Sequence, residues 1–337
     1  MVRDDRRCPR DEHWGCPTNL EIPIVSLQPL EPFKAASVSV ILLIIYKFLD
    51  SAVAVQQTLY QFFCFSSLEQ HRPQNYKPAH HEMSKTINTS FQGHDERFSA
   101  IVGPSPSLEL LAENHDYPFA HEAGVYNPIT NDLFTTSNRC TGPNGQQKVH
   151  ITRVDLSQNP VVTREEIPTK IPMANGGINY GKHHVLFCAQ GSMTEPSGLY
   201  RMSTAAPYQS ELLKQDFLGR PFNSVNDVVV HTDGSVWFTD PIYGSEQGYR
   251  PEPCLPNQVY RWCPDNGRIR AMADGFGRPN GICFSLDEKV VYITDTDRVH
   301  GDGTIDDQRV SSMYELFHSP MLYFFYLVKI ANDEAFI

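Results

Sequence analysis

The amino-acid sequence predicts an all-β fold, a β-propeller, for residues 96–309. Four apolar segments repeat in this region, and aligning them on Phe134, Phe187, Phe238 and Ile293 gives steps of 53, 51 and 55 residues. A nearly constant step of this size, with four short strands in each, is typical of propeller blades. Apolar residues at helical spacing are almost absent, and β-branched and aromatic runs alternate with turn residues. A β-sandwich is the lesser alternative.

The N-terminal residues 1–95 do not share this repeat. They are largely polar, and their one long apolar stretch lies within residues 35–55. That stretch is shorter than the roughly 20 apolar residues that span a bilayer, and its composition matches a signal segment or a signal anchor. We therefore expect a poorly structured extension, membrane anchoring through 35–55 or export, and a secreted or membrane-anchored protein. A buried helix is the alternative for the stretch, and a cytoplasmic protein is the alternative for the chain.

A β-hairpin within residues 222–244 is the clearest single element. Two runs rich in Val, Trp and Phe flank Asp233 and Gly234. Glycine accepts a positive φ at no steric cost, so this pair is a strong turn signal. Similar runs at 149–153, 198–202 and 258–262 predict a further strand in each of three repeats.

Composition and charge exclude some partners. The formal net charge is −11, and no cluster of Lys and Arg stands out, which argues against nucleic acid as a partner. The eight cysteines show no zinc-finger spacing and are interpreted mostly as buried thiols. The sequence makes no prediction of the oligomeric state.

Each repeat carries one polar residue at the start of its first strand. Glu122, Asn175 and Asn226 each lie 12 residues before the aligned apolar residue of their repeat, and for Asn280 the separation is 13. Innermost strands of a propeller line its central channel, so these positions are expected to converge there. One carboxylate with several amide oxygens suits a hard divalent cation. The alternative is that each Asn caps a turn through its own backbone.

Four strings in this region carry a family resemblance. They are His121 to Tyr126, Asn223 to Asp227, Trp237 to Pro241, and Arg278 to Gly281. In order and at blade spacing they resemble the SMP-30/gluconolactonase family, and its fungal lactonohydrolase members most. The resemblance covers about residues 98–308. It implies a six-bladed propeller with a divalent cation in the channel that hydrolyses a small-molecule lactone.

The same resemblance implies roles for individual residues. The expected metal ligands are Glu122, Asn226 and Asn280. Ca²⁺ is the expected cation, with Zn²⁺, Mg²⁺ or Mn²⁺ as alternatives. The expected substrate contacts are Asn175, Asp227, Asp240 and Tyr243.

Residues 310–337 depart from the family pattern. The family continues into a fifth blade, whose Pro-Asp-Gly motif supplies the last metal ligand and the general base, whereas this segment contains no such motif, no turn signal and no hairpin. We therefore expect about four blades, an atypical tail over 310–337 and no assigned catalytic residue. The predicted function is metal-dependent ring opening of a small lactone, impaired by the missing blades. The alternative is a non-catalytic truncated propeller that acts as a binding or unstable fragment.

Overall fold

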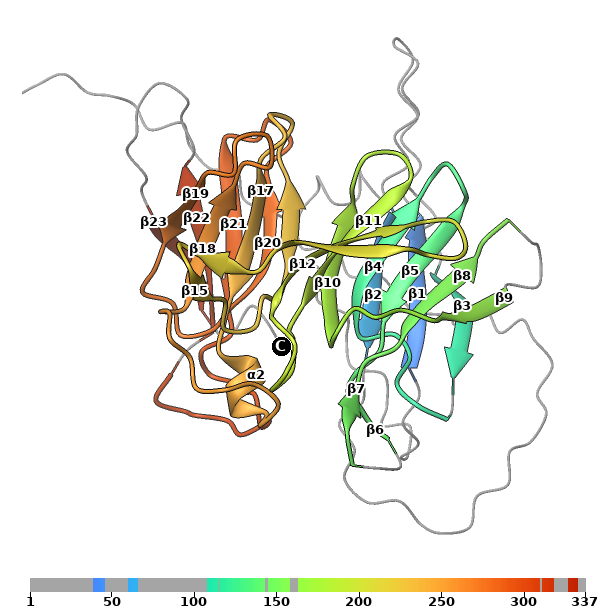
Figure 1. Ribbon diagram of the computed structural model, residues 1–337, viewed down its shortest axis with the longest axis horizontal. Helices are drawn as coiled ribbons and strands as arrows, with labels where there is room; N and C mark the ends of the chain where they lie inside the picture. The colour runs from blue at the N-terminus through green and yellow to red at the C-terminus, as the bar shows by residue number, and fades with distance from the viewer. Residues whose placement is uncertain are drawn as a thin grey trace, which may run out of the picture.

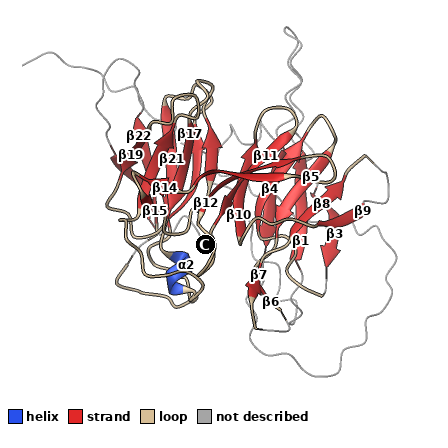
Figure 2. Cartoon of the chain, viewed as in Figure 1, coloured by secondary structure: helices blue, strands red, loops and turns tan. Residues whose placement is uncertain are grey.

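The computed structural model is all-β, with four four-stranded antiparallel sheets standing side by side (Figures 1 and 2). Apart from the short helix α2 (Tyr243–Glu246), every element named in the described residues is a strand. The predicted all-β propeller with about four blades is therefore confirmed. The structure describes residues 39–45, 60–65, 108–114, 116–142, 145–157, 163–309, 311–317 and 327–332.

Each blade is a meander in which every strand pairs with the strand before it in the blade. Blade 1 contains β4 (Glu122–Asn127), β5 (Asp132–Thr136), β8 (Ile151–Asp155) and β9 (Thr163–Ile167). Blade 2 contains β10 (Ala174–Asn179), β11 (His184–Ala189), β12 (Gly198–Ser203) and β13 (Ser210–Lys214). Blade 3 contains β16 (Val228–Val230), β17 (Val236–Asp240), β18 (Gln258–Trp262) and β19 (Ile269–Ala273). Blade 4 contains β20 (Pro279–Phe284), β21 (Val290–Asp295), β22 (Ser312–Phe317) and β23 (Leu327–Asn332). Two small ribbons pair β6 (Cys140–Thr141) with β7 (Gln147–Lys148) and β14 (Asp216–Phe217) with β15 (Arg220–Pro221).

The predicted hairpin within residues 222–244 is the pair β16 and β17, with Val228 opposite Phe238. Gly234 has a φ of 83° in the turn between them, as the Asp-Gly signal indicates. The further strands predicted in three repeats are β8, β12 and β18, the third strand of blades 1, 2 and 3.

The second strand of each blade joins neighbouring blades because its side chains alternate between two faces. On β11, Phe187 packs with Phe134 between blades 1 and 2, and Leu186 packs with Phe238 between blades 2 and 3. Trp237, the neighbour of Phe238, packs between blades 3 and 4. Full burial of such a side chain is worth about 1.5–3 kcal/mol, so these alternating contacts hold the innermost strands together.

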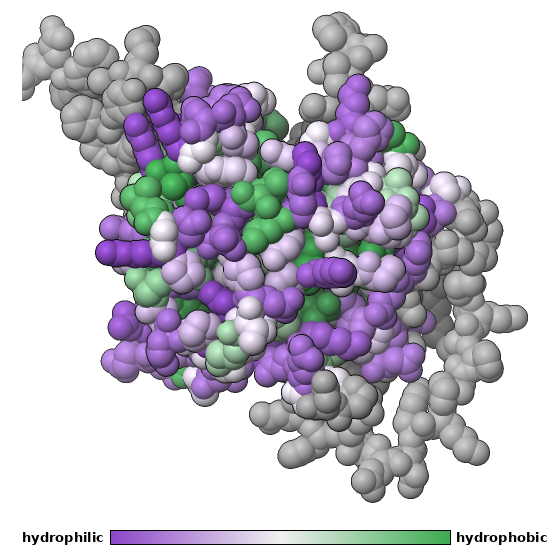
Figure 3. All heavy atoms as spheres, viewed as in Figure 1, coloured by the Kyte–Doolittle hydropathy of each residue, from purple (hydrophilic) through white to green (hydrophobic). Residues whose placement is uncertain are grey.

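The molecular surface is polar where it can be seen. On the face shown in Figure 3, hydrophilic side chains predominate and hydrophobic ones gather in small areas among them. Among the described residues, no helix is long and apolar enough to cross a membrane.

Part of the N-terminal region forms a sheet. The strands β1 (Ser39–Ile45), β2 (Tyr60–Phe65) and β3 (Leu108–Asn114) pair in the order β2-β1-β3, and β2 contacts β4 of blade 1. The helix alternative is therefore wrong for β1, whose Val and Ile residues favour a strand. The other residues of 1–95 lie outside the described chain, so anchoring through 35–55 and the localisation stay predictions.

The tail contributes two strands to blade 4. β22 pairs antiparallel with β21, and β23 pairs antiparallel with β22. The expected absence of a hairpin is therefore wrong for these residues. Two features explain why the sequence did not indicate these strands. The buried side chains of β22, Ser312 and Leu316, are four residues apart, a spacing that also fits a helix. The connection, residues 318–326, lies outside the described chain and contains no Asn-Gly or Asp-Gly signal.

A buried arginine holds the loop that precedes β16. Arg250 is 7% exposed, and its guanidinium donates to four backbone carbonyls, those of Ser192, Glu195, Phe222 and Asn223, at 2.8–3.0 Å. This clamp joins the loop before the innermost strand of blade 3 to a loop of blade 2.

Replacing Arg250 with Met should lower the free energy of unfolding by at least about 3 kcal/mol, because several carbonyls lose a charged donor worth roughly 1.5–3 kcal/mol each. Urea unfolding measures the change. The exposed Arg220→Met variant is the control and should change stability by less than about 0.5 kcal/mol. A loss below about 1 kcal/mol for Arg250→Met would contradict the clamp.

Candidate functional site

A cavity of about 320 Å³ lies where the first strands of the blades begin. It is lined by all four residues of the predicted ring, Glu122, Asn175, Asn226 and Asn280, and by Tyr243. The other lining residues are His121, Ser137, Asn138, Arg139, Val149, Gln190, Gln247, Thr296, Val299, His300 and Gly301. The predicted convergence of the ring residues is therefore present in the structure, and their roles as ligands stay predictions.

In three blades the first strand begins with an irregularity in its register with the second strand. The shifts fall between Glu122 and Val125, between Ala174 and Gly177, and between Pro279 and Ile282. Such bulges are frequent beside functional sites because the extra residue turns a side chain away from its regular direction. Here the bulges coincide with ring positions in blades 1, 2 and 4.

Threonine hydroxyls hold the backbone of two ring residues. The Thr136 Oγ1 of blade 1 donates to the carbonyl of Asn175 in blade 2 at 3.0 Å. The Thr239 Oγ1 of blade 3 donates to the carbonyl of Asn280 in blade 4 at 2.7 Å. Each bond crosses from one blade to the next, so the ring positions are fixed relative to one another.

A close backbone approach fixes the third ring residue. The Gly176 N–H donates to the carbonyl of Asn226 at 2.9 Å. A Cβ atom on Gly176 would lie 2.6 Å from that carbonyl oxygen and 2.6 Å from Asp227 Oδ1. Only glycine therefore fits between blades 2 and 3 at this point.

Two amide oxygens in the ring have no hydrogen-bond partner among the described residues. They are the buried Oδ1 atoms of Asn175 and Asn226. An unsatisfied buried acceptor costs about 1–3 kcal/mol, so buried polar atoms without a hydrogen-bond partner are rare in folded proteins and call for an explanation. The third amide is oriented differently, because Asn280 Nδ2 donates to the Tyr243 hydroxyl at 3.4 Å.

The carboxylate in the ring is protonated more readily than usual. Burial raises the pKa of Glu122 to about 8, and the negative charge of Asp227 acts in the same direction. A bound cation would reverse this balance, since an opposite charge favours the ionised carboxylate.

Asp227 and Asp240 lie behind the cavity wall rather than on it. The Asp227 carboxylate accepts from the backbone N–H groups of Val228 at 2.9 Å and Ile282 at 3.0 Å, which joins blade 3 to blade 4. The Asp240 carboxylate accepts from the N–H groups of residues 223 and 224, and burial raises its pKa to about 7. Both therefore position the backbone beside Asn226, and contact with a substrate stays a prediction for them.

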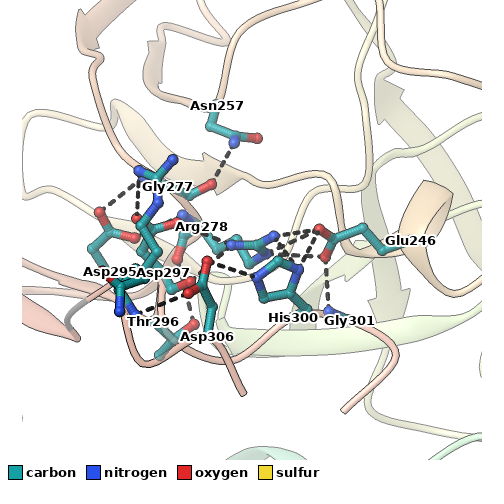
Figure 4. Close-up of polar contacts among 12 residues, drawn as sticks. Glu246, Asn257, Gly277, Arg278, Asp295, Thr296, Asp297, His300, Gly301 and Asp306 are labelled. Carbon is teal, nitrogen blue, oxygen red and sulfur yellow. Dashed lines mark hydrogen bonds and ion pairs between the residues drawn. The ribbon is translucent and has the colours of Figure 1, made fainter. Parts of the chain in front are cut away.

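The wall that contains Tyr243 is held by an ion-pair network (Figure 4). Arg278 Nε lies 3.0 Å from Glu246 Oε2, and its Nη1 lies 2.9 Å from Asp297 Oδ1. The same arginine contacts His300 Nδ1 at 3.0 Å through Nη2. Tyr243 itself bonds to the Thr296 hydroxyl. The network joins α2 to the loop after β21, so Tyr243 has a fixed place.

The cavity also contains basic residues that were not predicted as site residues from the sequence: His121, Arg139 and His300. His121 could have been found because it precedes Glu122 in the chain. Arg139 and His300 lie in connections that the repeat does not cover, so no spacing indicates them. Burial lowers the pKa of His121, and the charge of Arg139 lowers it further.

The residues present fit a divalent cation. Within the described chain no three His, Cys, Asp or Glu side chains converge, so a cation here would be held by one carboxylate and amide oxygens. Oxygen donors of this kind are the ligands that Ca²⁺ and Mg²⁺ prefer. The buried Oδ1 atoms of Asn175 and Asn226 supply two oxygen ligands to which no group of the described residues donates a hydrogen bond.

Comparison with known proteins identifies the family. Residues 146–300 match the model of the SMP-30/Gluconolactonase/LRE-like region. This part of the chain is similar to the SMP-30/gluconolactonase family. The family predicted from the four sequence strings is thereby confirmed.

Two curated relatives support the same family. The chain is 29% identical over 205 residues to lactonohydrolase oryL of Aspergillus oryzae, a match that covers 58% of this chain and 45% of that protein. It is 35% identical over 99 residues to a gluconolactonase of Zymomonas mobilis, covering 27% of this chain and 26% of that protein. These matches span less than half the length of either relative.

A solved gluconolactonase structure from Xanthomonas campestris also resembles the chain. The match has 24% sequence identity, a TM-score of 0.45, and covers 60% of each chain.

Thr239→Val should lower the free energy of unfolding by about 2–4 kcal/mol, because the hydroxyl both donates to the Asn280 carbonyl and accepts from the Asp227 N–H. Thr152→Val is the matched control, since Thr152 is fully buried and its Oγ1 has no hydrogen-bond partner in the described part of the chain. It should be neutral or stabilising in the same urea titration. Equal losses for the two variants would show that the bonds between blades contribute little.

Proposed function

We propose that the chain binds a divalent cation through Glu122, Asn226 and Asn280 and opens the ring of a small lactone by hydrolysis. The observation that carries the proposal is the pair of buried, unpartnered amide oxygens of Asn175 and Asn226 in the same cavity as Glu122. Asn175 Oδ1 is a fourth candidate ligand. The names of the curated relatives, a lactonohydrolase and a gluconolactonase, support the choice of substrate.

The cavity residues have distinct parts in this reaction. When bound, a divalent cation polarises the lactone carbonyl and stabilises the charge that develops on its oxygen. Glu122 balances the charge of the cation, and Tyr243 orients the Asn280 amide through the contact with Nδ2. The cavity volume of about 320 Å³ lies at the lower end of the range for small-molecule sites, roughly 300–1,000 Å³.

The reaction also needs a group that takes a proton from the attacking water. We assign no general base among the described residues. A positioned base typically contributes a factor of about 10²–10⁴ in rate. We therefore expect turnover to be slower by roughly that factor than in an enzyme that has such a base. A slow, cation-dependent rate is therefore the result that the proposal predicts.

Hydrolysis of a panel of aldonolactones and aromatic lactones, followed by pH-stat with Ca²⁺ or Zn²⁺, tests the proposal. Addition of EDTA should abolish the rate above the spontaneous background. Glu122→Gln keeps the size of the side chain and removes its charge, and it should lower kcat/KM at least about 10-fold. Glu252→Gln, an exposed glutamate, is the matched control and should leave the rate unchanged.

Two results would count against the proposal. A rate that EDTA does not change would exclude a cation-dependent reaction. No turnover across the whole panel would favour a non-catalytic propeller.

A further inference from the structure

The ionisable side chains of the cavity are mostly basic. Glu122 is the one carboxylate among the lining residues, whereas Arg139, His121 and His300 face the same space. Arginine stays charged at any pH at which proteins fold. With a divalent cation at Glu122, the cavity would carry excess positive charge, which a neutral lactone cannot balance.

Arg139 has only neutral partners among the described residues. Its Nη1 donates to Gln147 Oε1 at 3.1 Å, and its guanidinium lies 5.9 Å from the centre of the Tyr249 ring. By contrast, Arg153 and Arg278 pair with the carboxylates of Asp132 and Glu246. A guanidinium has five N–H donors, so most of the hydrogen-bonding capacity of Arg139 is left over.

The surroundings of Arg139 hold it in place. Tyr249 is 6% exposed, and its hydroxyl donates to Gln190 Oε1 at 2.6 Å. Gln190 lines the same cavity. Gln147 belongs to β7, which pairs with β6 directly after Arg139. Figure 1 shows β6, β7 and α2 at the same end of the sheets. Arg139, which directly precedes β6, and Tyr243, the first residue of α2, both line the cavity.

We propose that Arg139 binds a carboxylate carried by the substrate, so that the preferred substrates are lactones with a carboxylate substituent on the ring. This inference rests on the proposed lactone hydrolysis and names its substrate class. The planar guanidinium can accept a carboxylate in a two-pronged geometry, which gives it both affinity and orientation. The lactone carbonyl then lies toward Glu122 and the substituent toward Arg139.

Two lactones with the same five-membered ring test this. One is γ-butyrolactone-γ-carboxylate, and the other is γ-valerolactone, which has a methyl group in place of the carboxylate. The wild-type chain should prefer the first in kcat/KM. Arg139→Gln should lower kcat/KM for the carboxylate lactone by roughly 10- to 100-fold, the loss of charged hydrogen bonds, and change the neutral one by less than about threefold. Arg139→Lys keeps the charge without the planar guanidinium, so its kcat/KM for the carboxylate lactone should lie between those of the wild-type chain and Arg139→Gln.

Arg261→Gln is the matched control. Arg261 also stands over an aromatic ring, 6.0 Å from the centre of Trp237, but it does not line the cavity. It should leave the ratio of the two rates unchanged. An equal loss for both lactones in Arg139→Gln would overturn the inference and assign Arg139 to packing on Tyr249.

Product binding separates this inference from the proposed function. Hydrolysis of the two lactones yields α-hydroxyglutarate and γ-hydroxyvalerate, and their binding can be measured by calorimetry with Ca²⁺ present. Tighter binding of α-hydroxyglutarate that Arg139→Gln abolishes supports the carboxylate site even if no lactone is turned over. Equal binding of the two acids, or binding unaffected by Arg139→Gln, overturns it even if hydrolysis is observed.

Discussion

The position of every candidate ligand depends on the apolar packing between consecutive blades. The second strand of each blade has a side-chain period of two, so Phe187 faces one neighbour and Leu186 faces the other. This packing brings the first strands together at one end of the sheets. Hydrogen bonds then join one blade to the next at the ring residues. They involve the hydroxyls of Thr136 and Thr239 and the carboxylate of Asp227.

The polar residues at that end fall into two groups. Asp240 and Asp295 each accept hydrogen bonds from two backbone N–H groups of the loop that precedes an innermost strand, so both oxygens of each carboxylate have a partner within the protein. Asn175 and Asn226 instead have buried oxygens that accept no hydrogen bond from the described residues, each at a cost of about 1–3 kcal/mol. The rigid blades tolerate that cost, and a cation would remove it. This contrast distinguishes residues that hold the backbone around the site from residues that would bind a cation in it.

The ring of four residues could be predicted from the sequence because a fixed step places equivalent positions of a repeat on equivalent strands. The position of Asp227 and Asp240 behind the cavity wall could not be predicted in this way. The residue type alone does not show whether backbone N–H groups will donate to a carboxylate. Arg139 and His300 could not be predicted because they lie in connections outside the repeat. The strands β22 and β23 escaped notice because no tight-turn signal separates them.

The central claim is that the ring is a cation site, and calorimetric titration of the purified chain with Ca²⁺ tests it most directly. We predict binding of one Ca²⁺ per chain, at least 10-fold weaker in Asn226→Leu, in which an apolar side chain replaces a buried oxygen donor. Absence of binding by the wild-type chain, or an unchanged affinity in the variant, would contradict the account.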